Sequence, residues 1–120
     1  MATSLYDLSV TNYLQTLGGM EGFLGRELAH FQENKIDPDE IVETREALEQ
    51  LAPADVDALE GKDVVFQIRD TRIPFTAEGF IQSFSLPNFY FHATTAYDIL
   101  RSKGVPLGKR DFLGRMRLKT

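Results

Sequence analysis

The sequence predicts a mainly α-helical fold with one small β-hairpin before the last long helix. Apolar residues recur at spacings of three and four along residues 10–34, 37–51 and 77–102, as they do on helices with one apolar face. Apolar and polar residues alternate instead along residues 64–68, which is typical of a strand. With 120 residues, 42% of them hydrophobic and 26% charged, the chain is expected to form a single domain over residues 1–120.

The first helix is expected from Val10 to Asn34, with Ser9 or Thr11 as its N-cap. Four glycines interrupt it, at positions 18, 19, 22 and 25, and each costs about 1 kcal/mol relative to alanine. The glycines either permit the close approach of another helix or are tolerated locally, and the sequence leaves both explanations open.

The second helix is expected from Asp37 to Leu51. Asp37 is a good N-cap and Pro38 suits the first helical position, whereas Pro53 ends the helix. One further helical turn is expected over residues 54–59.

The hairpin is expected over residues 64–76, with a polar turn at residues 69–72. Pro74 cannot donate a backbone hydrogen bond, so the second strand is expected to be an edge strand. An isolated hairpin is marginally stable in water, and we therefore expect this one to lie on the helices.

The last long helix is expected from Ala77 to Ser102, with Thr76 as its N-cap and Gly104 as its stop. Pro87 either begins a new helix or kinks one long helix. The tail that follows contains five basic residues, and it is expected to be a solvated end or an intramolecular charge partner.

Composition excludes several classes of function. The formal net charge of −5 disfavours nucleic acid as a partner, and no apolar run approaches the roughly 20 residues that cross a bilayer. The chain has no cysteine, which excludes disulfides, zinc–thiolate sites and thiol nucleophiles. With an N-terminus unlike a secretory signal, these features favour a cytoplasmic protein without a membrane partner.

Only two histidines are candidate metal ligands, His92 and, more weakly, His30. His92 is spaced three, four and seven residues from Phe89, Ala96 and Ile99, so we expect it to face the apolar core and to be at least half buried. A buried histidine is either a core residue with a hydrogen-bond partner, such as Asn12, Tyr13 or Asn88, or a metal ligand. His30 near the end of its helix is explained by the helix dipole alone.

No catalytic motif accompanies these histidines. The sequence contains no HExxH, EF-hand loop, GxSxG or phosphate loop, and we assign no catalytic or cofactor-binding residue. The carboxylates at residues 37–43 cluster at a helix N-terminus, where the dipole explains them.

Three stretches, SLYDLSV at 4–10, PNFYFHATTAY at 87–97 and ILRSKGVPLGKRDFLG at 99–114, together resemble an uncharacterised domain-of-unknown-function family. Phe75-Thr76 before the aromatic helix extends the resemblance, which covers nearly all of the chain. The family belongs to the DinB/YfiT-like superfamily of metalloenzyme-type proteins.

The resemblance implies a four-helix bundle with a hairpin before its last long helix, and it matches His92 to the histidine of the family's C-terminal motif. Relatives often hold a divalent metal through histidines of different helices, and some are thiol-dependent transferases or hydrolases. Family members are longer, however, and Arg45 here runs directly into Glu46, where they continue through a helix with an Asp-His pair. The resemblance therefore implies a deletion or an omitted segment that removes one bundle helix and a second metal-binding histidine.

Two functions remain. Two histidines are too few for a complete metal site, which favours a non-catalytic helical module. We expect this module to form a homodimer, or a larger oligomer, through apolar residues of the first two helices, because the bundle helix that would cover them is missing. The alternative is an enzyme of the transferase or hydrolase type that uses a divalent metal, with His92 as one ligand. The sequence identifies no small-molecule ligand and does not decide between an enzyme and a binding module.

Overall fold

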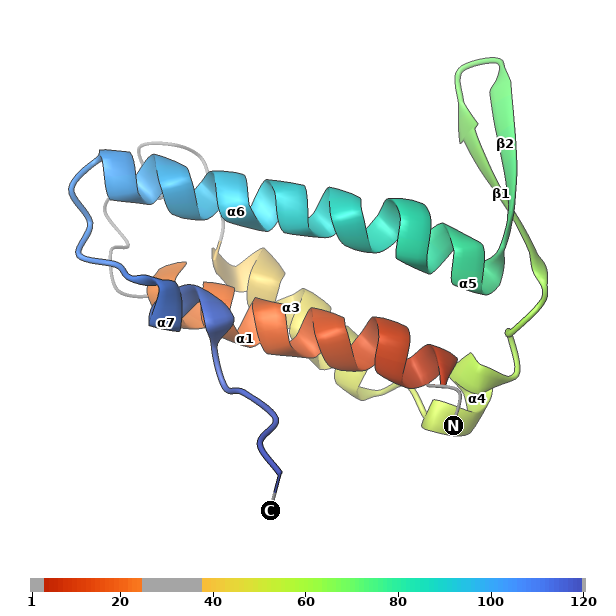
Figure 1. The fold of residues 1–120 in the computed structure, drawn as a ribbon, viewed down its shortest axis with the longest axis horizontal. Coiled ribbons are helices and arrows are strands. Elements are labelled where there is room, and N and C mark those ends of the chain that lie inside the picture. The colour runs from red at the N-terminus through yellow and green to blue at the C-terminus, as the bar shows by residue number, and fades with distance from the viewer. Residues whose placement is uncertain (1–3, 25–37, 120) are drawn as a thin grey trace.

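A computed structural model describes residues 4–24 and 38–119 of the chain (Figure 1). Within these residues, helical segments form most of the structure and one antiparallel hairpin joins two of them. The elements in chain order are η1 (Asp7–Thr11), α1 (Asn12–Leu24), α3 (Pro38–Glu49), α4 (Pro53–Asp57), β1 (Asp63–Ile68), β2 (Thr71–Thr76), α5 (Ala77–Phe80), η2 (Ile81–Ser85), α6 (Leu86–Ser102) and α7 (Lys109–Leu113). The mainly helical fold with a hairpin before the last long helix is therefore confirmed.

The first helix begins earlier than predicted, because the π-helical segment η1 precedes α1 without a break. The predicted N-caps were wrong, since Ser9 and Thr11 both lie inside the helical segment. Ser9 Oγ donates a hydrogen bond to the Leu5 carbonyl over 2.7 Å, the usual bond of a serine within a helix. Ser4 takes the capping role, because its Oγ accepts from the backbone N–H of Asp7 over 3.1 Å. Residues 25–34 of the predicted helix and the predicted cap Asp37 lie outside the described residues.

Helix α3 follows the predicted second helix closely, and α4 supplies the short turn expected after it. The junction between Arg45 and Glu46 lies within the continuous helix α3. Arg45 ties α3 to α1, because its Nε donates to Glu21 Oε2 over 2.6 Å. Within α3, its Nη1 also donates to Glu49 Oε1 over 2.8 Å. Both carboxylates favour the charged guanidinium and raise the pKa of Arg45 above its usual value.

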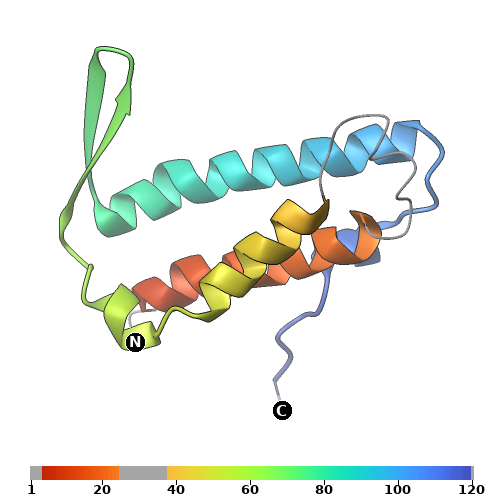
Figure 2. The ribbon, with the colours of Figure 1, turned by 180° about the vertical axis from the view of Figure 1, so that it is seen from behind.

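The hairpin pairs Val64 with Phe75 and Phe66 with Ile73, around a turn of two residues, Arg69 and Asp70. The turn is shorter than predicted because Arg69 adopts a positive φ of 54°, which lets the second strand begin at Thr71. The rings of Phe66 and Phe84 lie 4.6 Å apart, so the aromatic face of the hairpin packs on the helix that follows. The tip extends away from the helices (Figures 1 and 2), so only the base of the hairpin lies on them as predicted.

The segments α5, η2 and α6 form one continuous helical rod (Figure 1). Thr76 caps its start as predicted, since its Oγ1 accepts from the backbone N–H of Gly79 over 3.1 Å. Pro87 lacks the N–H that a regular helix would direct to an earlier carbonyl, and the π-helical segment η2 stands directly before it. Gly104, with a φ of 87°, follows the end of the rod, which was also predicted.

The core gathers where α1, α6 and the segment after α6 meet. Its fully buried members are Leu17, Met20, Ala93, Leu100, Val105 and Leu107. Helices α1 and α6 run in the same direction (Figures 1 and 2). Helix α3 crosses α1 behind it in the view of Figure 1 and in front of it in the view of Figure 2. Helix α1 packs more extensively on α3 and α7 than on α6, which leaves the rod at the margin of the molecule.

The molecule is broad and flat for its mass. Its extents are 47 × 44 × 22 Å, and its radius of gyration of 16.1 Å exceeds the roughly 14 Å of a compact 120-residue domain. Its accessible surface of 8443 Å² likewise exceeds the roughly 6,600 Å² expected for a compact monomer of this mass. The fold therefore leaves more surface in water than a domain of this size ordinarily does.

Candidate functional site

His92 lies on the exposed side of α6, so the prediction that it faces the apolar core was wrong. The buried positions of α6 are Ala93 and Leu100, and Ile99, one of the residues used to place His92, is itself 44% exposed. His92 is one residue before Ala93, and one residue turns a helix by about 100°. The histidine ring contacts the edge of the adjacent Phe91 ring, with centroids 5.4 Å apart.

Two of the three hydrogen-bond partners proposed for a buried His92, Tyr13 and Asn12, are engaged elsewhere. The Tyr13 hydroxyl forms a hydrogen bond with the Ser85 hydroxyl, and Asn12 bonds to Leu8 and Arg117. Burial raises the pKa of the Tyr13 phenol, which the hydrogen bond with Ser85 partly offsets.

A divalent metal finds no ready site in the described part of the chain. Among residues 4–24 and 38–119, no three histidine, aspartate or glutamate side chains gather closely enough to hold an ion. His92 alone does not meet the three or more ligands that metal sites use. The weaker candidate, His30, lies outside the described residues.

The side of α6 that carries His92 exposes two large apolar side chains. We call it the outer face, and it is formed by Phe91, Thr95 and Ile99 with Asn88 and His92 beside them. These residues follow the spacing of three and four that places side chains on one helical face, and all five are exposed. Phe91 is 66% exposed and Ile99 44% exposed. Since α6 buries Ala93 and Leu100 on its opposite side, it has two apolar faces and covers only one.

The apolar residues of the first two helices do not form a comparable surface. Leu17 and Met20 of α1 are buried in the core, and Ile41 and Leu48 of α3 are partly buried against it. The prediction that these helices expose an unmatched apolar face is therefore corrected for the described residues, and among the long helices α6 exposes Phe91 and Ile99 instead.

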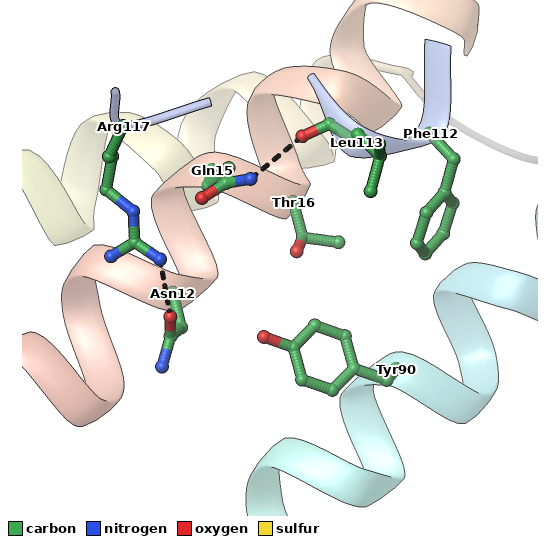
Figure 3. A pocket seen from close by; sticks show the side chains of 7 residues that line it. All are labelled: Asn12, Gln15, Thr16, Tyr90, Phe112, Leu113 and Arg117. Carbon is green, nitrogen blue, oxygen red and sulfur yellow. Dashed lines mark hydrogen bonds between the residues drawn. The ribbon is translucent and has the colours of Figure 1, made fainter. Parts of the chain in front are cut away.

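A pocket of about 180 Å³ opens between α1, α6, α7 and the tail that follows α7, residues 114–119 (Figure 3). Figure 3 shows Tyr90 reaching in from α6 toward three side chains of α1, with α7 and the tail closing the opposite side. The lining residues are Asn12, Gln15, Thr16, Tyr90, Phe112, Leu113 and Arg117. Thr16 is buried, so the pocket reaches from the surface to the edge of the core.

Two glycines bring α7 and the tail close enough to form this pocket. A Cβ atom on Gly19 would lie 2.6 Å from the carbonyl oxygen of Phe112, and one on Gly114 would lie 2.8 Å from the carbonyl oxygen of Gln15. Gly114 also has a φ of 64°, which favours glycine. The open possibility that the glycines of α1 permit close approach is therefore confirmed for Gly19, whereas a Cβ at Gly18 or Gly22 would meet nothing within 4 Å.

Hydrogen bonds then fix the polar side of the pocket. Gln15 Nε2 donates to the Leu113 carbonyl over 3.1 Å, and Arg117 donates from Nη2 to Asn12 Oδ1 over 2.9 Å. Asn12 Nδ2 donates to the Leu8 carbonyl over 3.0 Å, which leaves its oxygen facing Arg117. The tail is thus tied to α1 by a hydrogen bond rather than by a charge pair.

The chemistry of the lining favours binding over catalysis. It offers one guanidinium, two hydroxyls, two amides and two apolar side chains, but no carboxylate or imidazole to act as a general base near neutral pH. No pattern in the sequence predicted this pocket. The only hints in the sequence were the glycines of α1 and the basic tail, and neither indicates which helix the tail meets.

Comparison with known proteins identifies the family of this chain and a protein with the same fold. Residues 39–113, more than half of the chain, match a family described as a domain of unknown function, DUF1993, and the match spans the Arg45–Glu46 junction. A DinB family member protein from Shewanella denitrificans superposes with a TM-score of 0.71 at 22% sequence identity. That superposition covers 97% of this chain and 95% of the other, and at this identity it shows a shared fold. No curated protein matches the sequence.

Proposed function

The chain belongs to the DUF1993 family and has a DinB-like helical fold. We propose that it is a self-associating, non-catalytic helical module. The observation that carries the proposal is the outer face of α6, where Phe91 is 66% exposed in the first half of a 17-residue helix. A helix with apolar residues on two sides is typical of a bundle in which a further helix covers the second side.

A second copy of the chain is the occupant that we propose for this face. The surface exceeds that of a compact monomer by roughly 1,900 Å², and a stable interface buries about 800 Å² on each partner. A pair of α6 helices related by a twofold axis would cover the outer face of both copies at once. Symmetric dimers are also the commonest closed assemblies.

The composition of the outer face fits pairing with itself. Phe91 and Ile99 supply apolar area on either side of Thr95, whose hydroxyl bonds back to the Phe91 carbonyl over 2.7 Å and so requires no partner across the interface. None of the five outer-face residues is an aspartate, glutamate, lysine or arginine. Asp98, seven residues after Phe91, is an exposed carboxylate at the edge of this face, so a pair of copies must keep the two Asp98 side chains apart.

Light scattering tests the proposal on the full chain. We expect the mass of a dimer at micromolar concentration, and Phe91→Asp should shift it to the monomer mass because an unpaired carboxylate would be buried at the interface. Leu118→Asp is the matched control, since Leu118 is 74% exposed in the tail and should leave the dimer unchanged. A wild-type monomer at these concentrations would refute the proposal.

The alternative function is an enzyme that depends on a divalent metal, with His92 as one ligand. What supports it is the exposure of His92, which leaves its ring nitrogens accessible to an ion and to ligands from outside the described residues, such as His30. Metal analysis of protein never exposed to chelator, followed by titration with Zn²⁺, tests this alternative. Stoichiometric metal that is lost in His92→Leu would favour the enzyme, whereas a protein that neither holds nor gains metal would exclude it.

A further inference from the structure

We propose that the pocket between α1, α6 and α7 binds a small organic monocarboxylate with a short, flat apolar body. The carboxylate would pair with the Arg117 guanidinium, and the apolar body would lie against Phe112 and Leu113. This inference goes beyond the proposed self-association, because the pocket shares no residue with the outer face of α6.

The volume of the pocket sets the size of the ligand. At about 180 Å³ it is smaller than the roughly 300–1,000 Å³ of pockets that hold drug-sized molecules. The pocket therefore suits a ligand the size of one small ring or a short branched chain. The pocket reaches the buried Thr16 at its inner end and is open to water beside the exposed Tyr90 and Arg117, so a ligand of this size would be buried at one end.

The charge of the lining sets the charge of the ligand. Arg117 is the one charged residue among the seven that line the pocket. Its Nη2 donates to Asn12 Oδ1, and a guanidinium has five N–H donors, so donors remain for a carboxylate. Arginine and carboxylate match in a planar, two-bond geometry. A phosphate dianion fits less well, because no second cation lines the pocket.

The hydrogen bond from Arg117 to Asn12 positions the guanidinium before any ligand arrives. Asn12 is itself oriented by its bond to the Leu8 carbonyl, so the amide oxygen holds Arg117 at the mouth of the pocket. Tyr90 directs its hydroxyl toward α1 on the facing side (Figure 3), where it can donate to a carboxylate oxygen. The pocket thus presents one charged donor and one neutral donor to a bound anion.

The apolar side of the pocket is equally fixed. The Phe112 ring packs edge-on against Tyr97, with centroids 5.8 Å apart and an interplanar angle of 74°. The close contacts at Gly19 and Gly114 hold α7 against α1, so the Phe112 and Leu113 side chains keep their places. A preformed apolar surface of this kind favours binding, because little side-chain entropy is lost, and the planar ring of Phe112 suits a flat ligand.

Benzoate is the probe, and benzamide is its uncharged counterpart of nearly equal shape. In ¹H–¹⁵N NMR titrations of the full chain, benzoate should shift the amides of Thr16, Tyr90 and Phe112 in a saturable way. Benzamide should bind about tenfold more weakly, since it lacks the charge that pairs with Arg117. Shifts that do not saturate, or that fall elsewhere on the chain, would overturn the proposal.

Two variants of the tail complete the test. Arg117→Gln should weaken benzoate binding by about tenfold and leave benzamide binding unchanged. Arg115→Gln is the matched control, because Arg115 is an exposed cation of the same tail that does not line the pocket. Equal weakening by both variants would show attraction to the tail in general, and equal binding of benzoate and benzamide would show no role for charge. Either result would contradict the carboxylate site.

Discussion

The two sides of α6 carry similar residues but lie in different surroundings. On the inner side, Ala93 is 1% exposed and Leu100 2% exposed, and Phe89 packs edge-on against Tyr13 with ring centroids 5.0 Å apart. On the outer side, Phe91 and Ile99 remain in water. The inner side is therefore covered by other parts of this chain, whereas Phe91 and Ile99 on the outer side are not covered by the residues that the structure describes.

The largest effect is expected where the inner side is most completely buried. Leu100→Ala should lower the free energy of unfolding by about 2–5 kcal/mol, because it removes buried methyl groups and leaves a cavity. Ile99→Ala, one residue away on the outer side, should change it by no more than about 0.5 kcal/mol. Urea unfolding at protein concentrations too low for association measures both. Similar losses for the two variants would break the distinction between the sides.

A smaller effect is expected at Gly19 of α1, where α7 packs closely on α1. Gly19→Ala should cost roughly 1–3 kcal/mol, since the new methyl group would meet the backbone oxygen of Phe112 at 2.6 Å and α7 would have to move. Gly18→Ala is the matched control in the same helix, where the methyl group would meet nothing within 4 Å. The control should be stabilised by up to about 1 kcal/mol through helix propensity. Thermal unfolding that ranks the two variants in the opposite order would contradict the close contact.

The smallest effect concerns the polar bond on the inner side, between Tyr13 and Ser85. Tyr13→Phe should lower stability by roughly 0.5–1.5 kcal/mol, the range of a single hydrogen bond. Burial raises the pKa of Tyr13 above its usual 10.0, so the folded state holds the phenolic proton more tightly than the unfolded state. This contribution to stability is complete below pH 10 and is lost as the pH rises through the pKa of the folded state.

The free energy of unfolding, measured below and above pH 10, shows whether stability falls with rising pH as we expect. The wild-type protein should lose stability at alkaline pH more steeply than Tyr13→Phe does. Ser85→Ala should keep the steep loss, because it removes the hydrogen bond but leaves the buried phenol in place. If the stability of wild type and of Tyr13→Phe fell equally with rising pH, burial would not raise the pKa of the Tyr13 phenol.

Local rules predicted much of the fold. The apolar spacing identified the helices, the alternation identified the hairpin, and Thr76 and Gly104 marked the two ends of the last rod correctly. These features depend on residues a few positions apart, which sequence patterns report directly. The N-cap of the first helix was wrong because Ser4, Ser9 and Thr11 are all suitable caps, and the choice depends on where the helix begins.

The sites were harder to predict because they depend on what covers each face. Spacing placed His92 beside apolar residues, but α6 has apolar residues on two sides and the pattern cannot tell which one is covered. The pocket joins Asn12 to Arg117 across 105 positions in the chain, and no local pattern reports such a contact. Gly19 becomes informative only when α7 is seen against it.

The outer face of α6 is tested most directly by a cysteine placed at its centre. The chain has no cysteine, so Thr95→Cys supplies the only thiol, and Thr44→Cys places the control thiol at an exposed position of α3. If two copies pair through their outer faces, mild oxidation should join the Thr95→Cys variant into a disulfide-linked dimer far faster than the Thr44→Cys variant. Equal cross-linking of the two variants, or none in either, would contradict the pairing of α6 with a second copy of the chain.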